Sequence, residues 1–515
     1  MEEKRKGWIL AQKLTWIYLA VMGGIFPLYY QNGFFNILFS KYAFFGIATG
    51  IYAAVMVVLL AFCLRERTHR KRLFWLSSTD KWVLFFLVCC LISQIFTQYK
   101  DEAWSGAEGR YNGLLAMLLY ILSYVMVSRG YRKSKVIPWI FFLGGAAVNQ
   151  LAVLNHFMID PLNIQMILSK EQQSMFISTI GNINIFSGFA SMYVSMAFLD
   201  FCTAEKKSSR IRGIVGILIG MAGLIAGNSD GGFLGLIAVC IFSLIVFHVQ
   251  KRFLRPWVYG MILIFATSGM MGLFQELAGK GAIAYKGGVA QVFADTRFFI
   301  LAVAIGVIYP LLLGAMRFLK KKNFTKKQLL SIVLLIMVLC AVIAVAVNYS
   351  SLQSFFRKSA LLEFDDQWGT YRGFVWKRCF WIYLDLPLLQ KIFGCGLETV
   401  RMLMNQYYRS EMIQIAGRIY DNAHNEYLQY LVTIGFAGFT AYVGILCQSV
   451  GTALRYSKKH RVLLVWAAGV IAYAAQSTVN ISQSAITFFL FLWIALIEGA
   501  RRAEIFEQQE PETKP

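Results

Sequence analysis

Charged side chains are scarce in this sequence. They make up 15% of its 515 residues, whereas 58% of the residues are hydrophobic and the mean hydropathy is +0.57. A soluble domain of this length could not bury so much apolar surface in one core, so a soluble protein is excluded. The composition predicts a membrane protein.

Long apolar runs recur along the whole chain. Each is long enough, or nearly so, to cross roughly 30 Å of hydrocarbon as a helix. The sequence therefore predicts an all-α polytopic membrane protein with about fourteen transmembrane helices. The approximate runs are 14–31, 42–63, 82–97, 113–128, 137–157, 183–201, 213–227, 231–248, 257–274, 298–316, 329–347, 428–450, 462–480 and 484–497.

Acidic residues are also few, since 27 of them stand against 50 Lys and Arg residues and the net charge is +23. In a soluble protein this excess would suggest a nucleic-acid partner. Here, however, the basic residues gather in alternate loops between the apolar runs. The positive-inside rule then predicts that both termini are cytoplasmic and that the number of spans is even, with no nucleic-acid partner.

This topology divides the chain into four parts. Residues 1–347 would hold transmembrane helices 1–11, and residues 348–427 one large extracytoplasmic loop with amphipathic helices. Residues 428–500 would hold helices 12–14, and residues 501–515 a cytoplasmic tail. A loop of roughly eighty residues is far longer than an ordinary connection and is either functional or disordered. Its aromatic residues favour order.

Sequence motifs for metal ligation are missing. The chain has no CxxC, no HExxH and no Asp-rich cluster, so neither a metal site nor a cofactor is expected. Seven of the nine cysteines lie in or beside the apolar runs, as packing residues. Cys379 and Cys395 lie outside them and could pair in an oxidising compartment. No spacing rule requires that pair, and two independent thiols are the favoured interpretation.

Away from their ends, the predicted helices also lack Asp, Glu, Lys and Arg. Ion-coupled transporters commonly carry such a residue near the membrane midplane, so a polysaccharide or lipid transporter fits the span count but not the charge pattern. Polar residues that could do chemistry gather instead in the outer segments, which predicts an outward-facing site. They are Arg110, Asn182, Asn184, Asp230, Arg297, Arg372 and His424.

Histidine is rare as well, with five in the chain, and His424 is expected in the first outer turn of the predicted twelfth span. Asp421 or Asn422 could cap that helix, whose N-terminus disfavours a protonated imidazole. A neutral histidine could accept the proton of an alcohol that attacks a phosphate-activated donor. The alternative is an interfacial histidine that only forms hydrogen bonds.

Four stretches carry a family resemblance. HNEYLQYLVTIGFAG at 424–438 resembles the signature of the O-antigen ligase and O-antigen polymerase family, in which His-Asn is followed by nine residues and Gly-x-x-Gly. The matching residues are His424, Asn425, Gly435 and Gly438. The other stretches resemble the same family in the same order: EGRYNGLLAMLLY at 108–120, GNINIFSGFASMYV at 181–194, and RGFVWKRCFWIYLDLPLLQKIFGCGLETV at 372–400.

The resemblance implies a metal-independent glycosyltransferase of the bacterial cytoplasmic (inner) membrane. It would take a glycan from undecaprenyl pyrophosphate and join it to a hydroxyl of a glycan or lipid acceptor on the outer side, in surface polysaccharide biosynthesis. Ligation and polymerisation use the same donor and the same base, so both remain open. The alternatives from other classes are a transporter and a binding or scaffold protein that has lost catalysis.

Roles for single residues follow from the resemblance. His424 would be the catalytic base, and Arg372, which matches the family's loop arginine, would bind the pyrophosphate. One position departs from the family pattern: Asp230 stands where the arginine of a Ser-Arg-Gly sequence is expected. A carboxylate repels pyrophosphate, so another cation must substitute or the activity is lost. The candidate substitutes are Arg110, Arg297 and Arg378, and the candidate polar contacts are Asp230, Asn182, Asn184 and Asn425.

Overall fold

The structure, a computed structural model, describes residues 2–64, 67–249, 251–285, 288–320 and 364–507. Over these residues the chain is almost entirely helical, which confirms the predicted all-α class. One short antiparallel ribbon, β1 (Phe176–Ile177) with β2 (Gly181–Asn182), comes just before α9. The predicted run 329–347 and the first part of the predicted outer loop lie outside the described residues.

Nine helical segments within the described residues are long and apolar enough to cross a membrane. They are α1 (Glu2–Ala20) continued by η1 (Val21–Ile25) and η2 (Phe26–Leu28), α2 (Ile37–Cys63), α4 (Ser78–Phe96), α7 (Ile137–His156), α9 (Ile183–Thr203), α10 (Lys207–Ala226), α11 (Gly231–Val249), α12 (Leu254–Ala278) and α21 (Gly435–Tyr456). The chain is thus a multi-pass membrane protein.

Further helices coincide with the remaining described runs. Shorter apolar helices occur within α6 (Leu114–Gly130), α14 (Arg297–Lys320) and α22 (Val462–Gln476), and α23 (Thr487–Glu507) covers the last predicted run. The count of about fourteen spans stays a prediction. The connecting elements are η3 (Gly33–Asn36), α3 (Arg67–Phe74), α5 (Lys100–Ser105), α8 (Lys170–Gln173), η4 (Lys251–Phe253), η5 (Gly279–Gly281), α13 (Gly288–Phe293), α17 (Trp368–Asp385), α18 (Leu388–Phe393), α19 (Val400–Ala416) and α20 (Glu426–Thr433).

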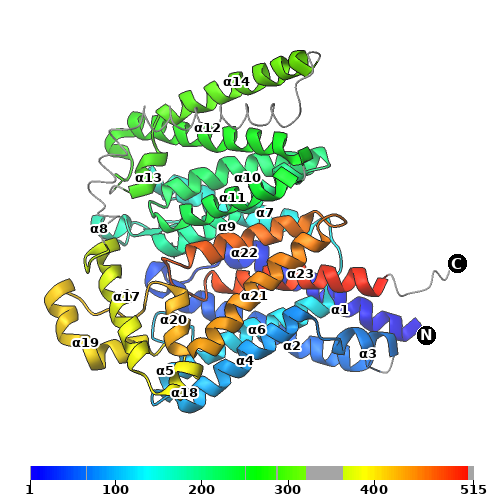
Figure 1. Cartoon of the computed structure of the whole chain (residues 1–515), viewed down its shortest axis with the longest axis vertical. Helices are drawn as coiled ribbons and strands as arrows, with labels where there is room; N and C mark the ends of the chain where they lie inside the picture. Colours follow the sequence, from blue (N-terminus) through cyan, green and yellow to red (C-terminus); the bar gives the residue numbers. More distant parts are fainter. Residues whose placement is uncertain (1, 65–66, 250, 286–287, 321–363, 508–515) are drawn as a thin grey trace.

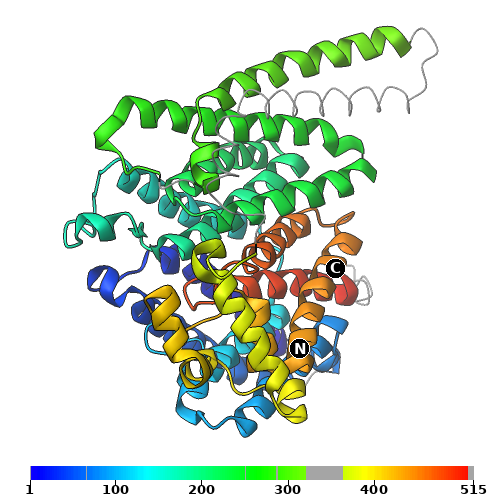
Figure 2. The ribbon, with the colours of Figure 1, turned by 60° about the vertical axis from the view of Figure 1, so that its left-hand side comes forward.

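The bundle has two distinct ends. Figure 1 shows α17 and α19 at one end, whereas the first turn of α1 and the last turn of α23 lie at the other. The view in Figure 2 brings α17 and α19 to the front and leaves the termini behind them. The two termini therefore share one end of the bundle, as an even number of crossings requires.

Helix α9 lies in the middle of the bundle. In an 18-residue stretch of α9, 94% of the residues are buried, against 33–56% in the other candidate spans, so α9 lies inside the bundle. Residues 487–503 of α23 are buried as well. The small residues of α9 make its burial possible, because they allow neighbouring backbones to approach closely. A Cβ added to Gly232 of α11 would lie 2.2 Å from Ser187 Oγ, and one added to Gly235 would lie 2.3 Å from Ser191 Oγ.

The predicted single helix over 428–450 is wrong, because the chain breaks between α20 and α21. Gly435 opens α21 with φ of +69°, and a Cβ there would lie 2.3 Å from the Ile392 carbonyl oxygen. On the facing segment, a Cβ on Gly394 would lie 2.1 Å from the Thr433 carbonyl oxygen. The break thus needs glycine on both sides, where α18 packs against the start of α21.

The helices extend beyond the predicted apolar runs, and these extensions carry buried charged residues. Lys41 lies in α2, buried, and its Nζ donates to carbonyl oxygens of the preceding turn at 2.9–3.1 Å. At the end that holds the termini, Asp80 pairs with Arg129 at 3.0 Å and also with Arg502. Glu498 of α23 forms an ion pair with Arg502, with 3.3 Å between Oε1 and Nε. These buried charges have partners, which reduces the cost of burying them.

Candidate active site

His424 lies in the turn between α19 and α20. Its backbone is left-handed, with φ of +50°, and its N–H donates to Asn422 Oδ1 at 2.9 Å. Asn425 is the residue that caps α20, because its Oδ1 accepts from the Leu428 N–H at 3.0 Å. Both the expected cap at Asp421 or Asn422 and the expected place of His424 inside the helix are therefore wrong. The imidazole precedes the helix and remains partly exposed.

Burial and the surrounding positive charges together keep the His424 side chain neutral. Burial of the ring is the largest cause, and the positive charges of Arg372 and Arg110, and more weakly Arg418, act in the same direction. Together they lower the pKa of His424 to about 3, against the opposing effect of Asp421. The helix N-terminus alone suggested a neutral ring, and the structure adds a cluster of arginines. A neutral imidazole can accept a proton, and the neighbouring arginines can bind an anionic group at the same time.

Arg110 brings a distant part of the chain to this turn. Its Nε and Nη2 donate to the two carboxylate oxygens of Asp421 at 2.9 and 2.6 Å. This two-bond contact joins the loop before α6 to the loop before α20. Asp421 partly offsets the positive charge of Arg110, but Arg110 still lowers the pKa of His424.

Arg372 carries an unused donor. It follows three left-handed residues, Gly369 to Tyr371, and its Nη1 donates to the Gly369 carbonyl oxygen at 2.8 Å. Its Nε is buried and has no hydrogen-bond partner within the described residues. A buried donor without a partner costs free energy, and an anionic oxygen would satisfy it. Burial lowers the pKa of this guanidinium, with Asp230 and Tyr420 acting against that effect.

Arg418 is a site residue that sequence reasoning missed. Its Nη2 donates to the Tyr420 hydroxyl at 2.7 Å, and the guanidinium lies over the Tyr420 ring at 4.6 Å from the centroid. The Tyr420 ring in turn meets the His424 ring edge-on at 6.1 Å. In the sequence, the sign that Arg418 belongs to the site was its position six residues before the His-Asn motif.

Asp230 is tied to α13 and faces Arg372. Its Oδ1 accepts from the Val289 N–H at 2.7 Å, and Gly288 has φ of +83°. A Cβ on Gly288 would lie 2.6 Å from either carboxylate oxygen, so glycine permits the contact. Burial raises the pKa of Asp230, opposed by the backbone N–H groups of α13 and by Arg372. The carboxylate therefore anchors α13 and partly offsets the charge of Arg372.

Asn182 and Asn184 organise the start of α9. Asn182 caps the helix, because its Oδ1 accepts from the Asn184 N–H at 2.9 Å. Asn184 Oδ1 accepts from the Ser229 hydroxyl at 2.7 Å, and its carbonyl oxygen accepts from Asn480 Nδ2 at 2.8 Å. These bonds hold the turn that carries Asp230.

The other two predicted substitutes have acidic partners of their own. Arg297 pairs with Asp295 at 2.5 Å. Arg378 pairs with Asp366 at 2.7 Å and with Glu411 at 3.0 Å. Neither is among the charges that act most strongly on His424. Cys379 and Cys395 are both buried and not joined to each other.

Two buried carboxyl groups near the site were not predicted. Glu398 has φ of +59° and is 2% exposed, and its Oε2 has no hydrogen-bond partner within the described residues. Burial raises its pKa to about 8, although Arg110 opposes the shift. Glu426, the residue after the cap, accepts from the hydroxyls of Tyr442 at 3.0 Å and Tyr473 at 2.9 Å. It thereby fixes α20 to α21 and α22.

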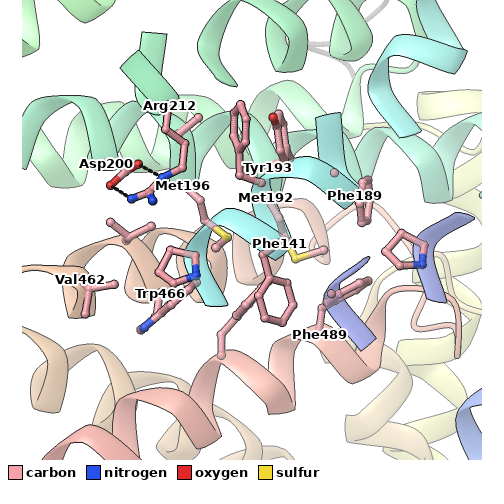
Figure 3. A pocket seen from close by; sticks show the side chains of 18 residues that line it. Phe141, Phe189, Met192, Tyr193, Met196, Asp200, Arg212, Val462, Trp466 and Phe489 are labelled. Carbon is pink, nitrogen blue, oxygen red and sulfur yellow. Dashed lines mark hydrogen bonds and ion pairs between the residues drawn. The ribbon is translucent and has the colours of Figure 1, made fainter. Parts of the chain in front are cut away.

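A separate cavity inside the bundle is unlike this site. It measures about 60 Å³ and is lined mainly by apolar side chains of α7, α9, α22 and α23, with the Asp200–Arg212 ion pair at one edge (Figure 3). Pockets that hold drug-sized ligands measure roughly 300–1,000 Å³. This small apolar cavity offers little room for a substrate.

A comparison with known protein families agrees with the resemblance of the sequence motifs. Residues 282–443 match the O-antigen ligase family. The predicted resemblance is confirmed, and a search of curated proteins finds no match to the chain. The O-antigen ligase match contains Arg297, Arg372 and His424, whereas Arg110, Asn184 and Asp230 lie before it in the sequence. The match and the apolar helices together support a membrane enzyme of ligase or polymerase type in polysaccharide biosynthesis.

Proposed function

We propose that this protein transfers a glycan from undecaprenyl pyrophosphate to an acceptor hydroxyl on the outer face of the bacterial cytoplasmic membrane, without a metal ion. The observation that carries the proposal is a neutral histidine among arginines, one of which has a buried donor that no described residue satisfies. A base for the acceptor and cations for the leaving group are what this reaction requires.

The proposed reaction is a displacement at the anomeric carbon of the glycan. His424 takes the proton of the acceptor hydroxyl while that oxygen bonds to the anomeric carbon of the glycan. The bond from that carbon to the pyrophosphate oxygen breaks, and undecaprenyl pyrophosphate leaves with the electron pair. Arg372, Arg110 and Arg418 would stabilise the charge that develops on the leaving oxygen. The imidazolium then returns its proton to water.

The first prediction tests the base. His424→Ala should lower the rate of transfer by about 10²–10⁴-fold while the protein still inserts, because general bases typically contribute that much. The measurement is glycan transfer from extracted undecaprenyl-pyrophosphate glycan by purified protein in liposomes, with a chelator present. His248→Ala, an exposed position at the far end of α11, is the matched control.

Two outcomes would count against the proposal. Wild-type transfer by a folded His424→Ala variant would remove the histidine from the mechanism, and a requirement for a divalent metal would contradict the metal-independent step. The reaction products also distinguish polymerisation from ligation. Longer lipid-linked glycans would indicate polymerisation, and glycan joined to a different acceptor would indicate ligation.

A further inference from the structure

A second cavity lies among α17, α18 and α19, and His424 does not line it. It measures about 270 Å³ and is formed by α17, α18, α19 and the turn before α5. This volume is close to the lower end of ligand-sized pockets, roughly 300 Å³. The side chains that give the cavity its chemistry are Tyr99, Asp385, Gln390, Gln406, Tyr407 and Tyr408.

The residues that line this second cavity indicate which class of ligand it could bind. Among the residues that form the cavity, Asp385 is the one with a charged side chain, so the wall offers no cation for a phosphate. Amide and phenol groups provide both donors and acceptors beside apolar side chains such as Ile382 and Leu403, so a wholly apolar acyl or isoprenoid chain would leave these polar groups without partners. Tyrosine rings add flat apolar faces beside these polar groups. A neutral polyhydroxylated ring matches this combination.

The backbone is shaped to form the cavity. Tyr407 and Tyr408 both line it, although adjacent residues of a regular helix do not face the same way. Helix α19 is kinked at Tyr408, with φ of −131° and ψ of 18°, which allows both rings to reach one space. The Tyr99 hydroxyl donates to Gln406 Oε1 at 2.8 Å, so α19 is also fixed to the turn before α5.

The cavity shares a helix with the candidate active site. Arg372 lies near the start of α17, and Ile382 and Asp385, at its other end, line the cavity. Ten residues of helix separate Arg372 from Ile382, which corresponds to about 15 Å. A short oligosaccharide can span such a distance while one end stays at the arginines.

We infer that this cavity is a saccharide subsite, which holds a neutral sugar unit of the glycan some units away from the reacting end. The inference rests on the proposed function, because that function supplies the glycan. The sugar can belong to the donor glycan or to the acceptor, since both would present the same chemistry.

Binding is tested with a probe that lacks the pyrophosphate. The probe is the free glycan released by mild acid from lipid-linked intermediates of cells that lack this protein. Wild-type protein and His424→Ala should both bind it. Gln390→Trp, which fills the cavity, and Tyr407→Ala, which removes an exposed ring, should each weaken binding roughly tenfold, as loss of one or two polar contacts does.

Gln414→Trp is the matched control, an exposed glutamine of α19 outside the cavity. Equal affinity in the wild type, both cavity variants and this control would overturn the inference, as would a wild type that does not bind the released glycan. Binding of the glycan by a wild type that transfers nothing would instead refute the proposed function and leave the subsite standing.

Transfer assays then identify the source of the sugar. If the subsite holds the donor glycan, Gln390→Trp should raise the KM for a full-length lipid-linked glycan and leave a donor with a single sugar unaffected. If the subsite holds the acceptor, the KM for the acceptor should rise with either donor. An unchanged KM for both substrates would overturn the inference while wild-type transfer continues to support the function.

Discussion

At the scale of single residues, His424 is unusual because cations surround a side chain that must accept a proton. Arg372 and Arg110 disfavour the imidazolium before the reaction begins. A pyrophosphate bound to the same arginines would reduce that effect, since a negative charge stabilises a protonated imidazole. The donor would thus make His424 a better base at the moment when the acceptor needs one.

The second prediction concerns the pH dependence of transfer. The neutral imidazole is the form that accepts a proton, and with a pKa of about 3 it is present at all pH values well above 3. An ordinary histidine would lose this form below about pH 6.5. We therefore expect kcat/KM, which reports the free enzyme, to show no acid limb between about pH 5 and 8. A loss of kcat/KM centred near pH 6.5 would contradict the assignment.

The third prediction separates charge from geometry at Arg372. Arg372→Lys keeps a positive charge but loses the planar fork and the buried Nε donor, so the KM for the donor should rise about tenfold or more. Arg372→Ala should raise it further. The same lysine substitution at Arg409, exposed on α19, is the control. Donor affinities that stay equal across all these proteins would show that the pyrophosphate binds elsewhere.

Some of the site could be predicted from the sequence and some could not. His424 and Arg372 sit in motifs whose local pattern suggests a base and an anion-binding cation. The pair between Arg110 and Asp421 joins residues 311 apart, and no local pattern encodes such a contact. Asn425 was missed as the cap of α20 because Asp421 and Asn422 are equally good capping residues by type.

At the scale of elements, the apolar pattern located helices but not their breaks. Residues 428–450 look like one span because their hydrophobicity is continuous. Gly435 interrupts it, since only glycine tolerates both its φ of +69° and the close Ile392 carbonyl oxygen. The glycine that matches the family signature therefore has a structural reason: it lets α18 approach the start of α21. That reason depends on a chain segment about forty residues away, which periodicity cannot reveal.

The fourth prediction concerns the contact between α13 and the turn that carries Asp230. Gly288→Ala should place a Cβ against the Asp230 carboxylate and impose φ of +83° on an alanine, at a cost of about 1–3 kcal/mol. Hydrogen exchange over residues 288–293 should become faster, with weaker transfer. Gly281→Ala is the control, because a Cβ there meets nothing within 4 Å. Equal exchange in the two variants would show that Asp230 does not hold α13.

At the scale of the whole molecule, the placement of apolar side chains agrees with a membrane surface. Helices α17 and α18 expose large apolar residues, among them Phe380, Trp381 and Leu388. Such residues suit the headgroup region, where apolar and aromatic side chains of an interfacial helix are accommodated. Helices α17 and α18 would thus rest against the outer leaflet, where a lipid-linked donor presents its pyrophosphate.

The last prediction tests the orientation of the chain, on which the proposed chemistry depends. Basic residues cluster on the loops at the end that holds the termini, and the positive-inside rule places that end in the cytoplasm. A cysteine at Ser410, exposed on α19, should therefore react with a membrane-impermeant maleimide in intact cells. A cysteine at Lys71, exposed on α3, should react only after permeabilisation. The opposite result would put His424 and the arginine cluster in the cytoplasm, where the proposed transfer to an outer acceptor could not occur.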